Sequence, residues 1–175
     1  MSPFKKSFIP EEAQSKLVYC FILLFSFIWL VLISLAPLLT GLEGHYEKTG
    51  SLIYFFFSKT CHQEDARSFH LFGEKMAVCS RCLGIYAGFF IGTCLYPWKF
   101  KLNNIIPPSV YFLIIAIVLL IIDVILDQFN LLKNTFASRS ITGFIAGVIL
   151  PFFIIPGFVR FYYEVESFLR NKVST

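Results

Sequence analysis

Four long apolar stretches, separated by shorter polar segments, dominate the chain. They run from Leu17 to Leu39, from Met76 to Trp98, from Pro108 to Gln128 and from Ile141 to Val159. A helix rises about 1.5 Å per residue, so about 20 apolar residues are needed to cross a bilayer core about 30 Å thick. Each stretch is about that long, and the pattern therefore predicts four transmembrane helices.

A fifth apolar segment, Ser51 to Ser58, is too short to cross a bilayer. It leads into a polar cluster, which favours a short re-entrant helix covered by protein, with an interfacial helix as the alternative. The expected fold is an all-α integral membrane protein with four transmembrane helices plus this short re-entrant or interfacial helix. We divide the chain into a cytoplasmic N-terminal segment (1–16), a single transmembrane domain (17–162) and a cytoplasmic tail (163–175).

The composition agrees with this fold and excludes a soluble domain. Apolar residues make up 57% of the chain and charged residues 15%, whereas soluble domains have about 45–50% and about 25%. The Lys and Arg residues behind the net charge of +4 are scattered between apolar runs, so nucleic-acid binding is not expected. They are slightly more numerous on the side that holds both termini, which the positive-inside rule places in the cytoplasm.

Glycines recur at every fourth position in two of the apolar stretches. Gly84, Gly88 and Gly92 lie in the second stretch, and Gly143 and Gly147 lie in the fourth. Small residues at this spacing allow two helix backbones to approach closely within a membrane. We expect the second and fourth helices to pack together, unless the glycines only reflect their abundance in membrane helices.

Polar residues are rare in this chain, and they concentrate in a Cys/His-rich loop and helix start at 61–82. This segment contains Cys61, His62, Gln63, Glu64, Asp65, Arg67, His70, Cys79, Arg81 and Cys82. At about 100° per residue, Cys79 and Cys82 lie about 60° apart on a helix. Both sulfurs can therefore face the same ion or the same partner.

The first interpretation of this segment is a metal site. Cys79 and Cys82 have the spacing of half of a structural zinc site, and Cys61 with His62 would complete a tetrahedral set. His70 is the reserve ligand. Zinc is the first expectation, and iron, including non-covalent haem, is the second. Four protein ligands would indicate a structural metal, whereas three ligands plus water would leave room for chemistry, so enzymatic activity stays open.

Two further interpretations of the cysteines remain. A thiol-disulfide oxidoreductase would use the Cys79-x-x-Cys82 pair, because a helix N-terminus and Arg81 stabilise a thiolate, with a membrane quinone or a partner protein as electron exchanger. Alternatively, no cofactor binds, and Cys61 either forms a plain structural disulfide with one of the pair or the cysteines are simply reduced buried thiols. Cys20 and Cys94 stand alone in apolar stretches and are expected to be small core residues.

Two carboxylates, Asp123 and Asp127, lie one helical turn apart in the third apolar stretch. A charged side chain inside a membrane is costly, so it usually pairs with another charge. Arg81 and Arg139 are the available partners. The sequence thus predicts a polar pocket beneath the cysteines, the default location for a substrate. Its expected residues are Arg67, Arg81, Tyr86, Asp123, Asp127 and Arg139. A small transporter that uses the Asp123/Asp127 pocket is the third functional alternative.

Several of these motifs together resemble a known family. Cys61-His62-Gln63, Arg67-Ser68-Phe69 and the stretch MAVCSRCLGIYAG from Met76 to Gly88 resemble the signature of DUF2085, an uncharacterised family of prokaryotic membrane proteins. The later positions Asp123, Asp127-Gln128, Arg139, Thr142-Gly143 and Gly147 fit the same pattern. The resemblance implies a small multi-pass protein in the inner (plasma) membrane of a prokaryotic cell, with the lipid bilayer as its partner. It implies no reaction.

Overall fold

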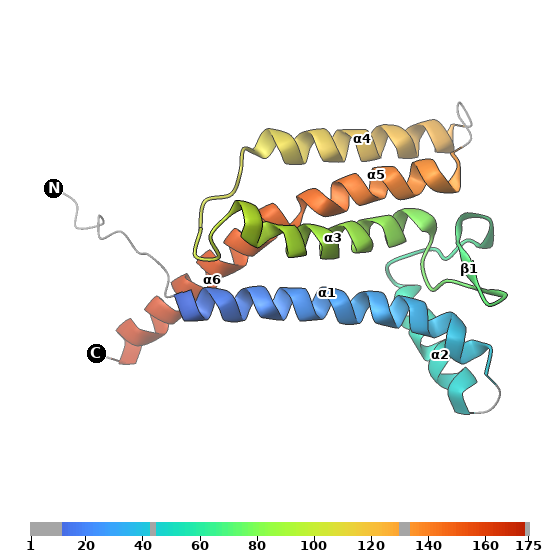
Figure 1. Cartoon of the computed structure of the whole chain (residues 1–175), viewed down its shortest axis with the longest axis horizontal. Coiled ribbons are helices and arrows are strands. Elements are labelled where there is room, and N and C mark those ends of the chain that lie inside the picture. The colour runs from blue at the N-terminus through green and yellow to red at the C-terminus, as the bar shows by residue number, and fades with distance from the viewer. Residues whose placement is uncertain (1–11, 43–44, 130–133, 174–175) are drawn as a thin grey trace.

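The computed structural model describes residues 12–42, 45–129 and 134–173, and helices dominate it (Figure 1). The helices are α1 (Glu12–Thr40), α2 (His45–Phe57), α3 (Ser80–Lys99), α4 (Val110–Gln128), α5 (Phe136–Ile149) and α6 (Pro151–Val173). Between α2 and α3 lie a 3₁₀ turn, η1 (Asp65–Arg67), and an antiparallel hairpin of β1 (His70–Leu71) and β2 (Glu74–Lys75). Residues 1–11 of the predicted N-terminal segment and residues 174–175 of the predicted tail lie outside the described residues.

Four helices run side by side along the long axis of the molecule. α3 lies between α1 and α5, and α4 packs on the other side of α5 (Figure 1). α6 continues the course of α5 and turns toward α1, which it contacts together with α3. α1 begins and α6 ends at the same end of the bundle, whereas α2 and the hairpin lie at the opposite end.

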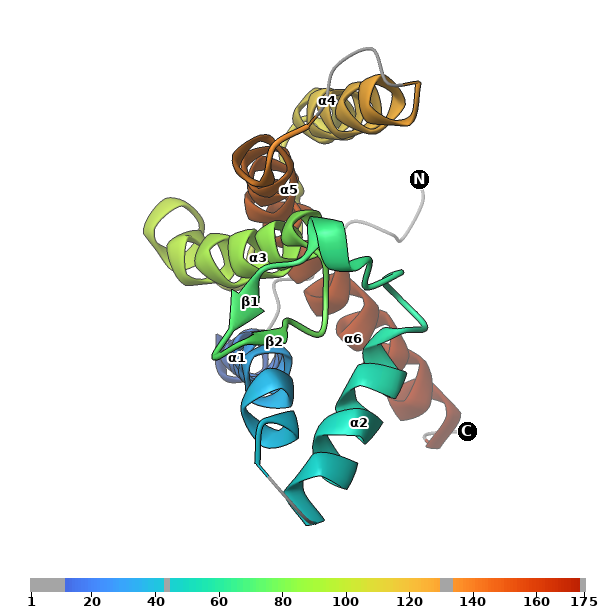
Figure 2. The ribbon, with the colours of Figure 1, turned by 90° about the vertical axis from the view of Figure 1, so that its right-hand side faces the viewer.

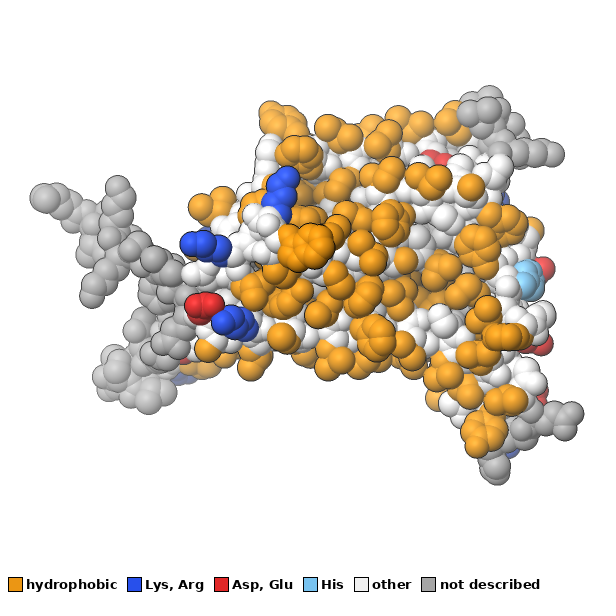
Figure 3. All heavy atoms as spheres, viewed as in Figure 1, with side chains coloured by type: hydrophobic (Ala, Val, Ile, Leu, Met, Phe, Trp, Pro, Cys, Tyr) orange, Lys and Arg blue, Asp and Glu red, His pale blue; other side chains and the backbone are white. Residues whose placement is uncertain are grey.

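Within the described residues, three helices are long and apolar enough to cross a membrane: α1, α4, and the combined helix from Phe136 to Leu169 that α5 and α6 form. Four transmembrane helices are therefore not confirmed. The second predicted span, α3, is not among the three, because glycines, tyrosines and Arg81 dilute its apolar residues. Apolar side chains cover the long sides of the bundle, and most of the charged ones visible in this view lie toward its two ends (Figure 3).

The glycine pattern correctly predicted the packing of α3 against α5. A Cβ atom added at Gly84, Gly88 or Gly92 would overlap the carbonyl oxygen of Ser140, Phe144 or Val148, respectively. In return, a Cβ atom at Gly143 or Gly147 would overlap the carbonyl oxygen of Arg81 or Ile85. Glycine is therefore required on both sides of this contact, which we call the glycine seam.

The elements differ from the expected ones in three places. The short helix α2 begins at His45 and not near Ser51, so it is longer than predicted. The fourth apolar stretch is divided between α5 and α6 at Pro151, because proline has no N–H for the preceding turn and favours the first position of a helix. The hairpin was not expected, and its turn places Phe72 and Gly73 at φ values of 55° and 87°, as a tight two-residue turn requires.

Candidate functional site

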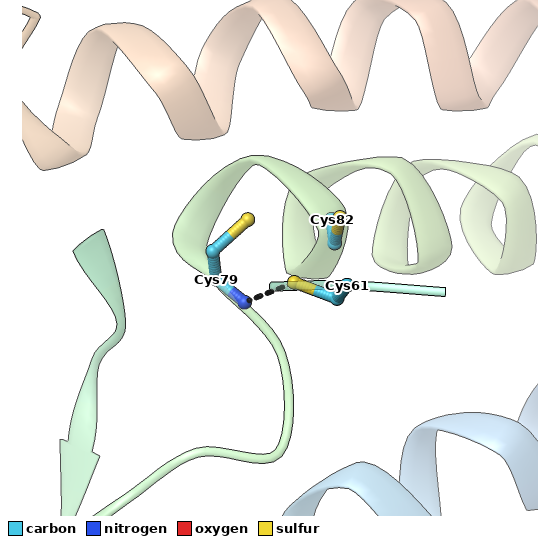
Figure 4. A group of neighbouring side chains, drawn as sticks. All are labelled: Cys61, Cys79 and Cys82. Carbon is cyan, nitrogen blue, oxygen red and sulfur yellow. Dashed lines mark hydrogen bonds between the residues drawn. The ribbon is translucent and has the colours of Figure 1, made fainter. Parts of the chain in front are cut away.

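Three cysteines from two parts of the chain meet at the start of α3. Cys79 is the N-cap of α3, Cys82 lies in its first turn, and Cys61 follows α2. Their three sulfur atoms all lie within 4.8 Å of one another (Figure 4). The backbone N–H of Cys79 also donates a hydrogen bond to the sulfur of Cys61, with a distance of 3.2 Å. This cysteine cluster therefore links the loop to the helix.

The loop that holds Cys61 is fixed by hydrogen bonds from its neighbours. The side-chain amide of Gln63 donates to the carbonyl oxygens of Tyr54, at 2.7 Å, and Ala77, at 2.8 Å. The hydroxyl of Tyr54 donates to the carbonyl oxygen of Lys75. Burial raises the pKa of the Tyr54 phenol, so this group stays a donor at neutral pH. α2 and the hairpin thus hold Cys61 against α3.

All five cysteines lie within the described residues, and each is a free thiol. Cys61 is buried on a small apolar core that includes Phe57 and Val78, while Cys79 and Cys82 are half-buried. Cys94 is half-buried as well, but Cys20 is exposed. The prediction that Cys20 is a core residue is therefore wrong, because its side of α1 faces away from the other helices.

Two arginine–aspartate pairs lie beside the cysteine cluster. Arg81 on α3 donates to one carboxylate oxygen of Asp123 on α4, from Nε at 3.1 Å and from Nη2 at 2.5 Å. Arg139 on α5 donates from Nη2 to both oxygens of Asp127, at 2.9 and 3.0 Å. Nη2 of Arg67 lies 3.9 Å from Asp127. These bonds connect the loop, α3 and α5 to the same end of α4.

The cysteines and the arginines share one pocket, with a volume of about 380 Å³. We call it the polar pocket. Its walls contain Cys61, Cys79, Cys82, Arg67, Arg81 and Arg139, together with Thr60, His62, Gln63, Glu64 and Gln128. Asp123 and Asp127 are not wall residues, and they hold the guanidinium groups of two of the three arginines. A polar pocket therefore lies beside the cysteines, with arginines as its charged surface, whereas the expected wall residues Asp123, Asp127 and Tyr86 do not line it.

The two histidines of the predicted site and Tyr86 occupy different positions. His62 is exposed and lines the polar pocket. Its ring nitrogens do not belong to the group of ligand atoms within 4.8 Å of one another that the three sulfur atoms form. His70 lies on the hairpin, and its Nε2 atom is 3.2 Å from a carboxylate oxygen of Asp65. Tyr86 faces a second, apolar cavity, where its ring centroid lies 5.8 Å from that of Trp29. The structure thus groups His62 with the cysteines more closely than His70.

The sequence interpretation assigned no role to Thr60, Gln63, Glu64 and Gln128, which also line the polar pocket. Gln63 had a signal in the sequence, because it directly follows Cys61 and His62 in the polar segment. Gln128 directly follows Asp127 at the end of α4. Its proximity to the cysteines depends on how α4 packs, which no local pattern encodes.

Comparisons with other proteins agree with this picture. Residues 61–153 match the family DUF2085, which is described as a predicted membrane protein. An uncharacterised protein of Methanocaldococcus jannaschii is 39% identical over 150 residues, 83% of this chain and 96% of that relative. Another, from Methanothermobacter thermautotrophicus, is 30% identical over 95 residues, 53% of this chain and 78% of that relative. No solved structure matches the chain. The matched segment begins at Cys61 and contains the whole cysteine cluster and both arginine–aspartate pairs, and the chain belongs to the DUF2085 family of predicted membrane proteins.

Proposed function

We propose that this protein is a multi-pass membrane protein that binds one transition-metal ion, zinc in the first place, at Cys61, Cys79 and Cys82. The observation that carries the proposal is the position of the three sulfur atoms within 4.8 Å of one another. Zinc binds thiolate sulfur at about 2.3 Å, which puts two sulfurs of a tetrahedral site about 3.8 Å apart. Small side-chain movements bring the cluster to that spacing. Iron, which the same soft ligands accept, is the second choice.

His62 is the residue we propose for the fourth position on the metal. Its side chain lines the polar pocket beside the three cysteines, and imidazole with thiolates is a common zinc ligand set. Three thiolates and one Zn²⁺ carry a net charge of −1, and the guanidinium groups of Arg67, Arg81 and Arg139 lie in the wall of the same pocket. If water replaces His62, the metal has an open position that faces the pocket.

We further propose that α3 is the fourth transmembrane helix. It has 20 residues, lies between α1 and the α5 part of the combined α5–α6 span, and its Arg81 is paired with Asp123. A helix enclosed by neighbours, with its charge neutralised, needs fewer apolar residues than one exposed to lipid. Four spans put both termini on one side, the cytoplasm according to the charge distribution. The cysteine cluster then lies at the opposite surface.

Elemental analysis of the purified protein in detergent, combined with a count of free thiols after denaturation, tests the metal proposal. We expect about one metal ion per chain and five free thiols once the metal is removed. Cys82→Ser should lose the ion and lower the melting temperature, because ligand loss removes binding free energy that is coupled to folding. Cys94→Ser, a half-buried thiol outside the cluster, is the matched control and should keep the ion. A metal-free protein that lacks two thiols would contradict the proposal.

A thiol-disulfide oxidoreductase is the second candidate function. The observation that favours it is the location of the free thiol of Cys79 at the N-terminus of α3, next to an open pocket. Two thiols would form a disulfide and pass two electrons and two protons to a quinone, which becomes a quinol, or to the disulfide of a partner protein. Trapping of a mixed disulfide in Cys82→Ser, in a protein without metal, would favour this function. A transporter has less support, because arginines already occupy both carboxylates.

A further inference from the structure

The polar pocket has an arginine side that the proposed metal site does not use. Arg67 comes from the turn η1, Arg81 from the first turn of α3 and Arg139 from the first turn of α5. Figure 2 looks onto the end of the bundle where α3 and α5 begin. Among the wall residues that the structure describes, Glu64 is the only carboxylate. The wall therefore presents three cationic groups and one anionic group to a bound molecule.

The carboxylates that hold two of these arginines do not line the pocket. The side chains of Asp123 and Asp127 are only 9% and 11% exposed. A guanidinium group has five N–H donors, and the aspartates use only part of them. Arg139 donates to Asp127 from Nη2, and Arg81 donates to Asp123 from Nε and Nη2. Each pair therefore fixes a guanidinium group in the wall and leaves N–H groups for a further acceptor.

Arg67 is the least restrained of the three arginines. Its Nε atom lies 2.9 Å from a carboxylate oxygen of the half-exposed Glu64, and its Nη2 atom lies 3.9 Å from Asp127, beyond hydrogen-bond distance. Arg139 donates to the same Asp127 carboxylate, so the guanidinium groups of Arg67 and Arg139 come close together. Like charges at this distance repel each other. An anion bound between them would reduce that repulsion.

We propose that the arginine side of the polar pocket binds a phosphate group, which belongs to a lipid headgroup or to a free phosphate. Guanidinium groups bind phosphate oxygens through parallel N–H···O bonds. The oxygens of a phosphate point in tetrahedral directions, so one phosphate can face arginines from three elements, whereas the two oxygens of a carboxylate lie in one plane. The volume of about 380 Å³ also admits a short attached group. This site uses arginines and the metal site uses cysteines, so either proposal can fail alone.

Arg67→Gln tests the site, because Arg67 is 40% exposed and its loss leaves both buried pairs intact. The protein in detergent is dialysed to equilibrium against radiolabelled inorganic phosphate. We expect saturation at about one phosphate per chain, and a dissociation constant at least about tenfold higher for Arg67→Gln. Arg160→Gln, an exposed arginine paired with Glu164 on α6, is the matched control and should keep the wild-type affinity. Absence of saturable binding to the folded wild type would overturn the proposal, as would equal affinities of wild type and Arg67→Gln.

Glu64→Gln should change the affinity in the opposite direction, which separates charge recognition from a general loss of structure. This change removes the carboxylate from the wall and releases Nε of Arg67, so phosphate should bind at least about twofold more tightly. An unchanged or lower affinity of Glu64→Gln would contradict the proposed site. The metal content is measured in the same samples. A wild type that holds a metal but no phosphate overturns only this proposal, and one that binds phosphate without a metal overturns only the metal proposal.

Two competition experiments define the ligand further. Phosphate binding is measured in nanodiscs of phosphatidylcholine with and without phosphatidic acid, whose headgroup is a phosphate monoester. Competition by phosphatidic acid would support the proposal with a lipid headgroup as the ligand, and undiminished phosphate binding would support it with a free phosphate as the ligand. Acetate should not displace phosphate. Displacement by acetate at the same concentration as phosphate would overturn the proposal, because the pocket would then accept any small oxyanion.

Discussion

α3 and α4 pack on opposite sides of α5, but they are held there by different means (Figure 2). Along the glycine seam, the backbone of α3 touches the backbone of α5 from Gly84 to Gly92. α4 makes fewer contacts with α5, and most of its apolar side chains are exposed. Its specific bonds to the rest of the bundle come from Asp123 and Asp127 near its end.

The difference follows from the solvent around the helices. Lipid is as apolar as a leucine side chain, so burial of apolar surface drives helix association only weakly in a bilayer. Close backbone packing or paired polar groups must therefore hold the helices together instead. α3 uses the first means from Arg81 to Gly92, and α4 uses the second at one end only. The polar pocket lies at that end, so the bonds that hold α4 also shape the candidate site.

Gly88→Leu should have the largest effect of any single change. A side chain at Gly88 would overlap the carbonyl oxygen of Phe144 and crowd Val148, so α3 and α5 must separate. We expect a loss of more than about 4 kcal/mol in the free energy of unfolding, or no folded protein. Gly157→Leu on α6 is the control, because no atom lies within 4 Å of a Cβ added there. The yield of monodisperse protein and the thermal unfolding temperature in detergent measure the stability of both variants. Equal stability of the two variants would show that close backbone packing along the glycine seam does not hold α3 against α5.

The glycine seam is also a feature that the sequence alone predicts. The repeat Gly84, Gly88, Gly92 has a helical period, so it identifies the face of α3 and its partner. The sequence also predicts that Cys79 and Cys82 lie on the same side of a helix, because helix geometry alone sets the angle between two residues at this spacing. The sequence suggested that Cys61 lies near Cys79 and Cys82 only through the interpretations that join these cysteines in one site. It depends on hydrogen bonds from Gln63 and Tyr54 that join distant parts of the chain.

Asp127→Asn should have the second-largest effect, and it should weaken the attachment of α4 to the bundle. The carboxylate of Asp127 accepts two bonds from Arg139, whose side chain is 10% exposed. Removing one partner of a buried pair leaves an uncompensated charge and costs about 3–5 kcal/mol. Denaturant titration of the protein in detergent gives this value. Asp127→Glu keeps the charge and should recover part of the loss. If Asp127→Asn is as stable as the wild type, charge pairing does not hold α4.

The Arg81–Asp123 pair should contribute less than the Arg139–Asp127 pair. The side chain of Arg81 is 17% exposed, compared with 10% for Arg139, so water can solvate Arg81 more readily when Asp123 is changed. We expect about 1–3 kcal/mol for Asp123→Asn. A double-mutant cycle with Arg81→Gln should show a coupling of at least about 1 kcal/mol. Strict additivity of the two single changes would mean that the pair does not connect α3 to α4.

Glu64→Gln should have the smallest effect, and it tests whether burial gives the pairs their strength. Glu64 forms an ion pair with Arg67 at 2.9 Å, but the two side chains are 52% and 40% exposed, respectively. Exposed pairs are worth about 0–1 kcal/mol, because water screens the charges and the side chains lose freedom. The loss should shrink further when salt is raised, whereas the loss from Asp127→Asn should change little, because buried pairs are screened less. Unfolding of both variants at low and high ionic strength measures this contrast. A loss from Glu64→Gln as large as that from Asp127→Asn would mean that position in the pocket, and not burial, determines how strongly a charge pair holds the bundle.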